Sequence, residues 1–190
     1  MLLELYKKLI LLGIVIGPIF WLVFTDDGQR RSDSVFLWLK GENSIEFNLK
    51  ELDAALTETE LKTVYPDITW KCETRETSFG DRLCLTLIGT FNDIPAKYLT
   101  LFFADQRISA LKLIYHPGYH KQLQGQLLQQ LGDAEDESRA AVTAPAPESI
   151  VRWRTNHGEV VVKRKLTEDE EAALFWLSPS RLMSYRQPDS

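Results

Sequence analysis

The sequence has few of the residues on which small catalytic and metal-binding sites usually depend. Its 190 residues include two cysteines and three histidines. Two cysteines exclude a fold held by a network of disulfides, and they cannot complete a four-ligand zinc site without a nearby histidine pair. The motifs G-x-S-x-G and H-E-x-x-H and a Gly-rich phosphate loop are also missing. We therefore expect no cofactor, and an enzyme would need a site of an unfamiliar kind.

An excess of positive charge is missing as well. The chain has 22 Lys and Arg against 27 Asp and Glu, a net charge of −5. A nucleic-acid binder needs a basic surface to displace counterions from phosphates, so no nucleic-acid partner is expected. The 26% charged and 44% hydrophobic residues match globular proteins and exclude wholesale disorder.

No charged or strongly polar side chain lies between Leu9 and Phe24. A transmembrane helix needs about 17–25 apolar residues, and Lys7 and Lys8 can lengthen this run by extending their stems along the helix. A buried core helix of the same length would show a polar face, which is missing here. The pattern predicts that residues 1–25 are a transmembrane anchor, with residues 9–24 in contact with membrane lipid.

The sequence after this segment lacks the features of a cleavage site. The segment is followed by Val23-Phe24-Thr25-Asp26-Asp27, which lacks the small residues of a signal-peptidase site, and no cysteine follows that would carry a lipid. We therefore expect an uncleaved anchor. The basic flanks, Lys7 and Lys8 against Arg30 and Arg31, nearly balance, so the positive-inside rule gives only a weak orientation.

Gly13 and Gly17 form a G-x-x-x-G pattern inside the anchor. This spacing allows two membrane helices to pack closely, so a homodimer through the membrane helix is one interpretation. The other is that glycine is simply common in membrane helices. Pro18 favours the second interpretation, because it kinks the span.

The remainder of the chain divides into three parts. Residues 26–47 are predicted to be a linker with a first strand at Val35–Leu39, residues 48–178 an α+β domain, and residues 179–190 a loose tail. The predicted architecture is an antiparallel sheet meander covered by helices.

Helices and strands are predicted from periodicity and turn residues. Capping boxes at Asn48 with Glu51 and at Thr57 with Glu60 predict helical structure across residues 49–64, and leucine spacing predicts a helix over residues 119–131 that ends at Gly132. Strands are predicted at Ile68–Thr74, Leu83–Phe91, Tyr98–Ala104, Ile108–Tyr115, Ile150–Arg154, Glu159–Lys165 and Ala172–Leu177.

Cys72 and Cys84 flank a predicted turn centred on Ser78, so they should lie opposite each other on neighbouring strands. Cross-strand positions bring Cβ atoms close to disulfide distance. We predict a disulfide, which places the domain in an oxidising, periplasmic compartment and the amino terminus in the cytoplasm of a cell with an inner membrane. Two buried free thiols are the alternative.

His116 and His120 are four residues apart, a spacing that on one helix can hold a metal ion. Pro117 and Gly118 interrupt that helix, so we interpret the pair as surface histidines and expect no metal site. Exposed aromatic residues are better candidates for a binding site. The aromatic candidates are Trp38, Tyr119, Trp153 and Trp176.

The strand from Tyr98 to Phe103 is apolar at both alternating sets of positions. One face of it is therefore expected to meet the core, and the other a partner.

The stretch from Asn48 to Gly132 resembles the small α+β modules of the BamE-like and β-lactamase-inhibitor-protein-like group. The resemblance rests on the helical opening, Trp70, the hairpin from Cys72 to Cys84, and the closing helix. It implies binding to other proteins of the bacterial envelope. We therefore expect an accessory or assembly subunit of a membrane complex. An enzyme with an unrecognised site and a small-ligand or metal sensor are the alternatives.

Overall fold

The computed structural model of the chain describes residues 43–134, 150–167 and 170–186. Several predictions therefore lie outside the described residues: the anchor at residues 1–25, Gly13 and Gly17, the strand at Val35–Leu39, and Trp38. Within the described residues, no helix has the length and apolar character needed to cross a bilayer.

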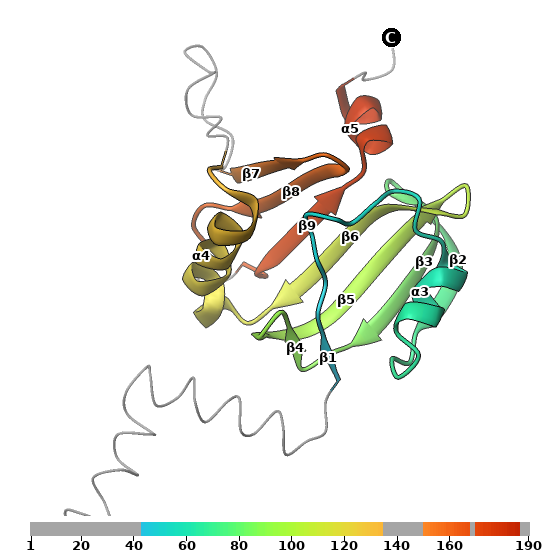
Figure 1. Cartoon of the computed structure of the whole chain (residues 1–190), viewed down its shortest axis with the longest axis horizontal. Helices are drawn as coiled ribbons and strands as arrows, with labels where there is room; N and C mark the ends of the chain where they lie inside the picture. The colour runs from blue at the N-terminus through green and yellow to red at the C-terminus, as the bar shows by residue number, and fades with distance from the viewer. Residues whose placement is uncertain (1–42, 135–149, 168–169, 187–190) are drawn as a thin grey trace, which may run out of the picture. The chain divides into compact units, whose positions relative to one another are not determined.

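The described chain is α+β, with few helices and a mostly antiparallel nine-stranded sheet, as the sequence predicted (Figure 1). The helices are α3 (Glu58–Val64), α4 (His120–Leu131) and α5 (Pro179–Arg186), with a single 3-10 turn, η1 (Pro117–Tyr119). The strands are β1 (Ser44–Ile45), β2 (Lys71–Thr77), β3 (Gly80–Leu87), β4 (Thr90–Phe91), β5 (Ile94–Ala104), β6 (Arg107–Tyr115), β7 (Ile150–Thr155), β8 (Gly158–Lys163) and β9 (Ala173–Leu177).

The long strands lie side by side in the order β2-β3-β5-β6-β9-β8-β7. The first four of them form the predicted meander. The last three return in reverse order, because β9 pairs with β6 and the β7–β8 hairpin lies beyond it. Strand β4 folds back on the start of β5, and β1 pairs with β4 in parallel.

Two of the hairpin turns carry non-glycine residues with positive φ. Asn92 and Asp93 have φ of 47° and 64°, and Asp105 and Gln106 have 51° and 66°, as two-residue turns between antiparallel strands require. The Asn92 side chain also bonds the backbone of Phe47: its Oδ1 accepts from the Phe47 N–H (2.7 Å) and its Nδ2 donates to the Phe47 carbonyl (2.8 Å). This side chain therefore continues the pairing of β1 with β4.

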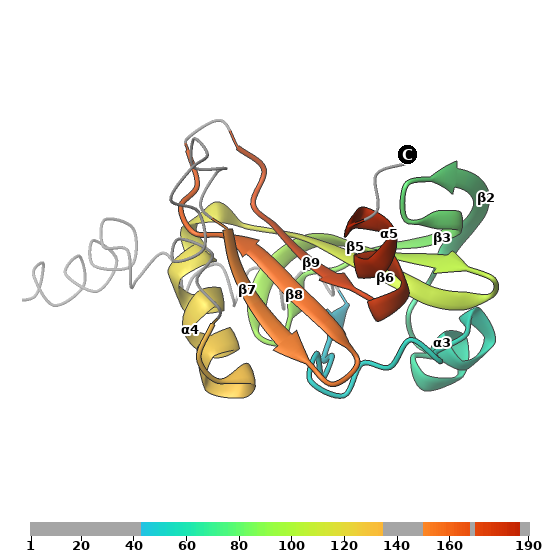
Figure 2. The same ribbon diagram turned by 90° about the horizontal axis from the view of Figure 1, so that it is seen from above.

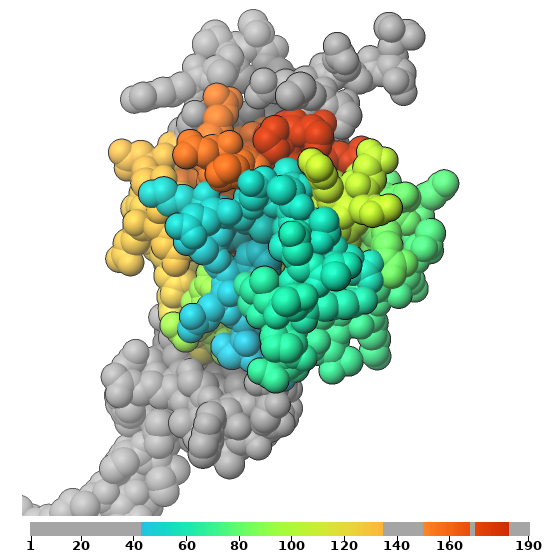
Figure 3. Space-filling view, turned by 45° about the vertical axis from the view of Figure 1, so that its right-hand side comes forward, coloured from blue at the N-terminus to red at the C-terminus, as the bar shows by residue number. Residues whose placement is uncertain are grey.

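One face of the sheet, which we call the core face, is covered by the chain from β1 to α3 and by α4. The register places Leu101 opposite Leu111, and Leu111 opposite Trp176, and all three are fully buried. They share one hydrophobic cluster with Leu61 of α3 and Leu123 of α4. In Figure 1 the N-terminal chain crosses in front of the strands, and in Figure 3 it forms a continuous layer over them.

Helix α3 begins at the second predicted capping box. The Glu60 N–H donates to the Thr57 hydroxyl oxygen (3.2 Å), and the Thr57 N–H donates to the Glu60 carboxylate (2.9 Å). The prediction of helical structure from residue 49 is wrong, since the preceding chain is irregular. There the side chains of Asn48 and Asp53 accept from backbone N–H groups two residues later, at 3.2 and 3.0 Å, which stabilises turns instead.

Helix α4 follows the prediction closely. Leu123 and Leu127 point into the core, while Leu128 is half exposed on the outer surface. The helix ends at Gly132, whose φ is 85° and whose N–H donates to the Leu128 carbonyl (3.0 Å). Figure 2 shows α4 along one side of the sheet, away from α3.

The folded part extends beyond the predicted limits at both ends. Strand β1 precedes residue 48, where the α+β domain was expected to begin. Residues 179–186 form α5, although the sequence predicted a loose tail there. The α5 residue Arg181 donates to the Phe79 carbonyl in the β2–β3 turn (3.2 Å), so the tail is attached to a distant hairpin.

Candidate functional site

The sheet face opposite the core face carries a second set of large apolar side chains. Directly opposed residues of neighbouring strands share a face, and the register pairs Leu83 with Phe102. We call the set Leu83, Leu85, Leu87, Phe102 and Phe175 the open face. None of its members belongs to the hydrophobic core cluster formed by the described residues.

The open face breaks the usual pattern of an antiparallel sheet. A sheet with one buried face normally alternates apolar residues facing the core with polar residues facing water. Strand β3 instead places leucines at positions 83, 85 and 87 on the side away from the core. Leu87 is 69% exposed, more than any other large apolar residue in the described part of the chain. The alternate positions of β3, on the core-face side, carry Arg82, Cys84 and Thr86, so the large apolar side chains of this strand all lie on the side away from the core.

The open face is hollowed into a groove. A cavity of about 510 Å³ has a floor that includes Leu83, Leu85 and Phe102. Phe79, at the tip of the β2–β3 hairpin, packs on Phe102 and Phe175 with ring centroids 5.1 and 6.0 Å apart. An aromatic cluster therefore lies beside Phe102, which lines the groove.

Charged side chains of both signs line this groove, among them Lys71, Glu76 and Lys112. Lys112 lies 3.5 Å from Glu171 and 5.9 Å from the centre of the Phe175 ring. An apolar centre with a mixed polar rim is typical of surfaces that bind proteins. A phosphate or nucleic-acid site would instead concentrate positive charge.

The chain enters the domain at the opposite end of the groove from Phe79. The Gly89 N–H donates to the Asn43 carbonyl (2.9 Å), and Ser44 pairs with Thr90. Gly89 is two residues beyond Leu87, so the first described residue lies close to the exposed end of β3.

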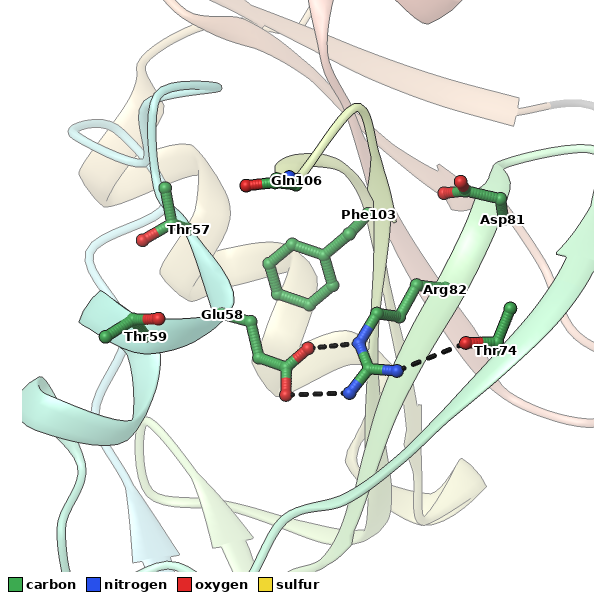
Figure 4. Close-up of a pocket in the computed structure, with 8 residues that line it drawn as sticks. All are labelled: Thr57, Glu58, Thr59, Thr74, Asp81, Arg82, Phe103 and Gln106. Atoms are coloured by element: carbon green, nitrogen blue, oxygen red, sulfur yellow. Dashed lines mark hydrogen bonds and ion pairs between the residues drawn. The ribbon is translucent and has the colours of Figure 1, made fainter.

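A second candidate site lies on the core-face side, between α3 and β3 (Figure 4). A cavity of about 360 Å³ there is lined mainly by polar side chains of α3, β2 and β3, with Phe103 behind them. The Arg82 Nε and Nη2 atoms both donate to the Glu58 carboxylate, the latter at 3.0 Å, and Nη1 donates to the Thr74 hydroxyl (3.3 Å). Lys62 adds a third donor to Glu58 at 2.7 Å.

These contacts set the ionisation of Glu58. The bonded Arg82 guanidinium, helped by Lys62, lowers the pKa of the Glu58 carboxyl to about 2 against the opposing effect of burial. The same contact raises the pKa of Arg82 above its usual range. Glu58 is therefore a permanent carboxylate at any physiological pH.

The two cysteines meet beside this ion pair. Cys72 on β2 is directly opposite Cys84 on β3, with Cα atoms 4.0 Å apart and the sulfur atoms at disulfide distance, as the sequence predicted. Cys84 is fully buried and Cys72 is half-buried. A carboxylate oxygen of Glu58 and the two sulfur atoms all lie within 4.8 Å of one another.

The interpretation of His116 and His120 as a pair of surface histidines is wrong for His120, which is buried. His116 is exposed, whereas His120 is buried with its Nδ1 atom 2.7 Å from the Tyr115 hydroxyl and its Nε2 atom 3.3 Å from the Arg164 carbonyl oxygen. Burial raises the pKa of Tyr115 above its ordinary value. His157 lies 3.8 Å from Asp53 at the surface.

Three of the four aromatic candidates are core residues. Tyr119, Trp153 and Trp176 are all buried, so the prediction that they form an exposed binding patch is wrong. Their positions fall on the core face or under α4, where large apolar side chains stabilise the fold.

Sequence reasoning missed most of the open face and the role of Glu58. The one pattern that pointed to the open face was the doubly apolar strand from Tyr98 to Phe103, which includes Phe102. Nothing local in the sequence links Glu58 to Arg82, which is 24 residues away.

Comparison with protein-family models, with curated proteins and with solved structures found no match to this chain.

Proposed function

We propose that this chain is a single-span envelope protein, anchored in the inner membrane by residues 9–24. Its exported domain binds another protein of the same membrane through the open face. The observation that carries the proposal is the row of leucines at positions 83, 85 and 87, which ends in the exposed Leu87 on the side of β3 away from the core. Exposed apolar surface with a polar rim is costly in water unless a partner covers it.

The short connection between the proposed anchor and the domain favours a membrane protein as the partner. Residues 25–42 connect the proposed anchor to Asn43, and a fully extended chain spans at most about 3.5 Å per residue. The domain therefore stays within about 60 Å of the bilayer. The first described residue, Asn43, accepts a hydrogen bond from Gly89, which is two residues beyond the exposed Leu87.

Other features support a binding role. The groove is apolar at its floor, paired in charge at its rim, and free of a cluster of nucleophile, base and oxyanion donor among its lining residues. The resemblance to BamE-like modules points to protein binding in the same compartment. As in the sequence-based prediction, the amino terminus is proposed to be cytoplasmic and the domain periplasmic.

Affinity purification of the full-length chain from detergent-solubilised native membranes tests the proposal. Val64 offers a matched control, because it is 61% exposed but lies on α3, on the core-face side. Leu87→Asp should lose a defined membrane partner that the wild-type chain and Val64→Asp both retain. Equal recovery with both variants would rule out the open face as the binding surface.

The anchor has its own test. The full-length chain should remain in the membrane pellet after carbonate extraction, and its intact mass should include residues 1–25. Release into the supernatant, or a mature chain that begins after Thr25, would refute the anchor and the assignment to the envelope.

A further inference from the structure

Three side chains from three different elements converge beside the β2–β3 hairpin. Glu58 is the first residue of α3, and Cys72 and Cys84 are directly paired on β2 and β3. Their carboxylate oxygen and two sulfur atoms lie within 4.8 Å of one another, and all three residues are at least half-buried. Two thiolates and one carboxylate are a donor set that suits Zn²⁺, which accepts both sulfur and oxygen ligands.

The carboxylate is held in place with room for one more ligand contact. A carboxylate offers about four lone-pair sites. Those of Glu58 accept two N–H groups of Arg82 and one of Lys62. One site therefore remains, and the hydrogen bonds fix the orientation of the group, as outer-shell partners do for ligands in metal sites.

The geometry needs only a small adjustment to enclose a metal ion. With Zn–S near 2.3 Å and Zn–O near 2.0–2.2 Å, the ligand atoms of a tetrahedral site lie about 3.5–3.8 Å apart. The three atoms here all lie within 4.8 Å of one another, so no separation exceeds the tetrahedral value by more than about 1 Å. Rotation of the two cysteine side chains, once they are no longer bonded to each other, changes these separations on that scale.

The oxidation state of the cysteines decides whether such a site exists. In the disulfide, neither sulfur is a thiolate and neither binds zinc strongly. A dithiol reductant transfers two electrons and two protons, which gives two thiols and leaves the reductant as its own disulfide. Zinc binding to the two thiols then releases two protons.

We propose that the reduced chain binds one Zn²⁺ ion through Cys72, Cys84 and Glu58, with the fourth position open to water. Two thiolates, one carboxylate and Zn²⁺ carry a net charge of −1, and Arg82, bonded to Glu58, offsets it. Disulfide formation and zinc binding are then mutually exclusive states of the same two cysteines. The proposal does not depend on the binding partner of the open face.

Cobalt titration of the purified full-length chain tests this site, because Co²⁺ replaces Zn²⁺ and reports thiolate ligation by a charge-transfer absorption. The chain is first reduced with a phosphine, which becomes the phosphine oxide. The reduced wild-type chain should bind one Co²⁺ with this absorption, and Zn²⁺ should displace it. The oxidised chain, folded and otherwise identical, should show no such absorption.

Variants then test each ligand. Cys72→Ser should abolish the charge-transfer band at one equivalent, and Glu58→Gln should raise the dissociation constant by on the order of tenfold or more. Glu73→Gln is the matched control, because Glu73 adjoins Cys72 in β2 but faces away from it, opposite Leu83. It should bind as the wild type does.

Two results would overturn the site. One is a reduced wild-type chain that binds no Co²⁺ while its far-ultraviolet circular dichroism stays native. The other is an equal affinity for Co²⁺ in Glu58→Gln and wild type, which would show that Glu58 is not a ligand and that only the two thiols bind the metal. Zinc should also raise the Tm of the reduced chain and not that of the oxidised chain.

Discussion

The two faces of the sheet are made from the same strands, yet they have different physical roles. Leu101 and Phe103 on β5 face the core and are fully buried, whereas Phe102 between them faces the groove. The core face is covered by chain that is itself part of the domain. The open face has similar apolar side chains but ends in the exposed Leu87. Burial in the core explains why Leu101 and Phe103 are apolar. It does not explain why the exposed Leu87 is apolar.

The largest expected effect contrasts neighbouring phenylalanines on the two faces. Phe103→Ala leaves a cavity in the core and should lower the free energy of unfolding by about 3–5 kcal/mol. Phe102→Ala should cost less, because Phe102, although only 8% exposed, lies outside the core cluster and contacts Phe79 at the groove. Denaturant unfolding of both variants measures the difference. Equal losses would mean that the open face is a second core.

Removal of the disulfide is expected to cause the second largest loss in the free energy of unfolding. It closes a short loop, so replacing both Cys72 and Cys84 by serine should lower the free energy of unfolding by about 3 kcal/mol. Chemical denaturation without reductant measures this. Mass spectrometry of the unreduced wild-type chain supplies the control, and two alkylatable thiols in that chain would contradict the bond.

The Glu58–Arg82 pair should appear in the pH dependence of stability. Because the folded-state pKa of Glu58 is lowered from 4.5 to about 2, its stabilisation is fully present above pH 4.5 and is lost as the pH falls towards 2. After allowance for solvent screening, this contribution is on the order of 1–2 kcal/mol. Glu58→Gln should remove that part of the dependence, and Glu73→Gln should not. If the free energy of unfolding depends on pH in the same way in wild type and Glu58→Gln, the ion pair does not stabilise the fold.

The smallest expected effect on stability is at the open face itself. Leu87→Asp replaces a side chain that is 69% exposed, so the free energy of unfolding should change by no more than about 0.5 kcal/mol. Thermal unfolding compares it with Val64→Asp. A loss as large as that expected for Phe103→Ala would show that Leu87 is part of the fold and not of a surface.

Local chemistry in the sequence was enough to predict the hairpins and two of the helices. The turn at Asp105-Gln106, the capping box at Thr57 and Glu60, and the glycine stop at Gly132 each act over a few residues. The pairing of Cys72 with Cys84 followed from the turn between them. These features depend on interactions between residues that are close together in the sequence, so they can be recognised from the sequence alone.

The remaining features depend on distant partners. Strand β9 lies beside β6 because Leu111 packs next to Trp176, and no local pattern specifies that register. Asn92 bonds the backbone of Phe47, which is 45 residues away. The Asn48–Glu51 pattern predicted a helix, although Leu49 and Leu52 reach the core from irregular chain whose turns Asn48 and Asp53 stabilise. The open face emerges only once the register assigns Leu83 and Phe102 to one side.

Site-specific photocrosslinking in native membranes tests the central claim most directly. A photoreactive side chain at Leu87 in the full-length chain should form a discrete crosslink to one membrane protein, while the same group at Val64, nearly as exposed on the other side of the sheet, should not. Leu85→Asp in the same chain should weaken the Leu87 crosslink. Crosslinks of equal strength from both positions, or a crosslink from Val64 alone, would contradict the account.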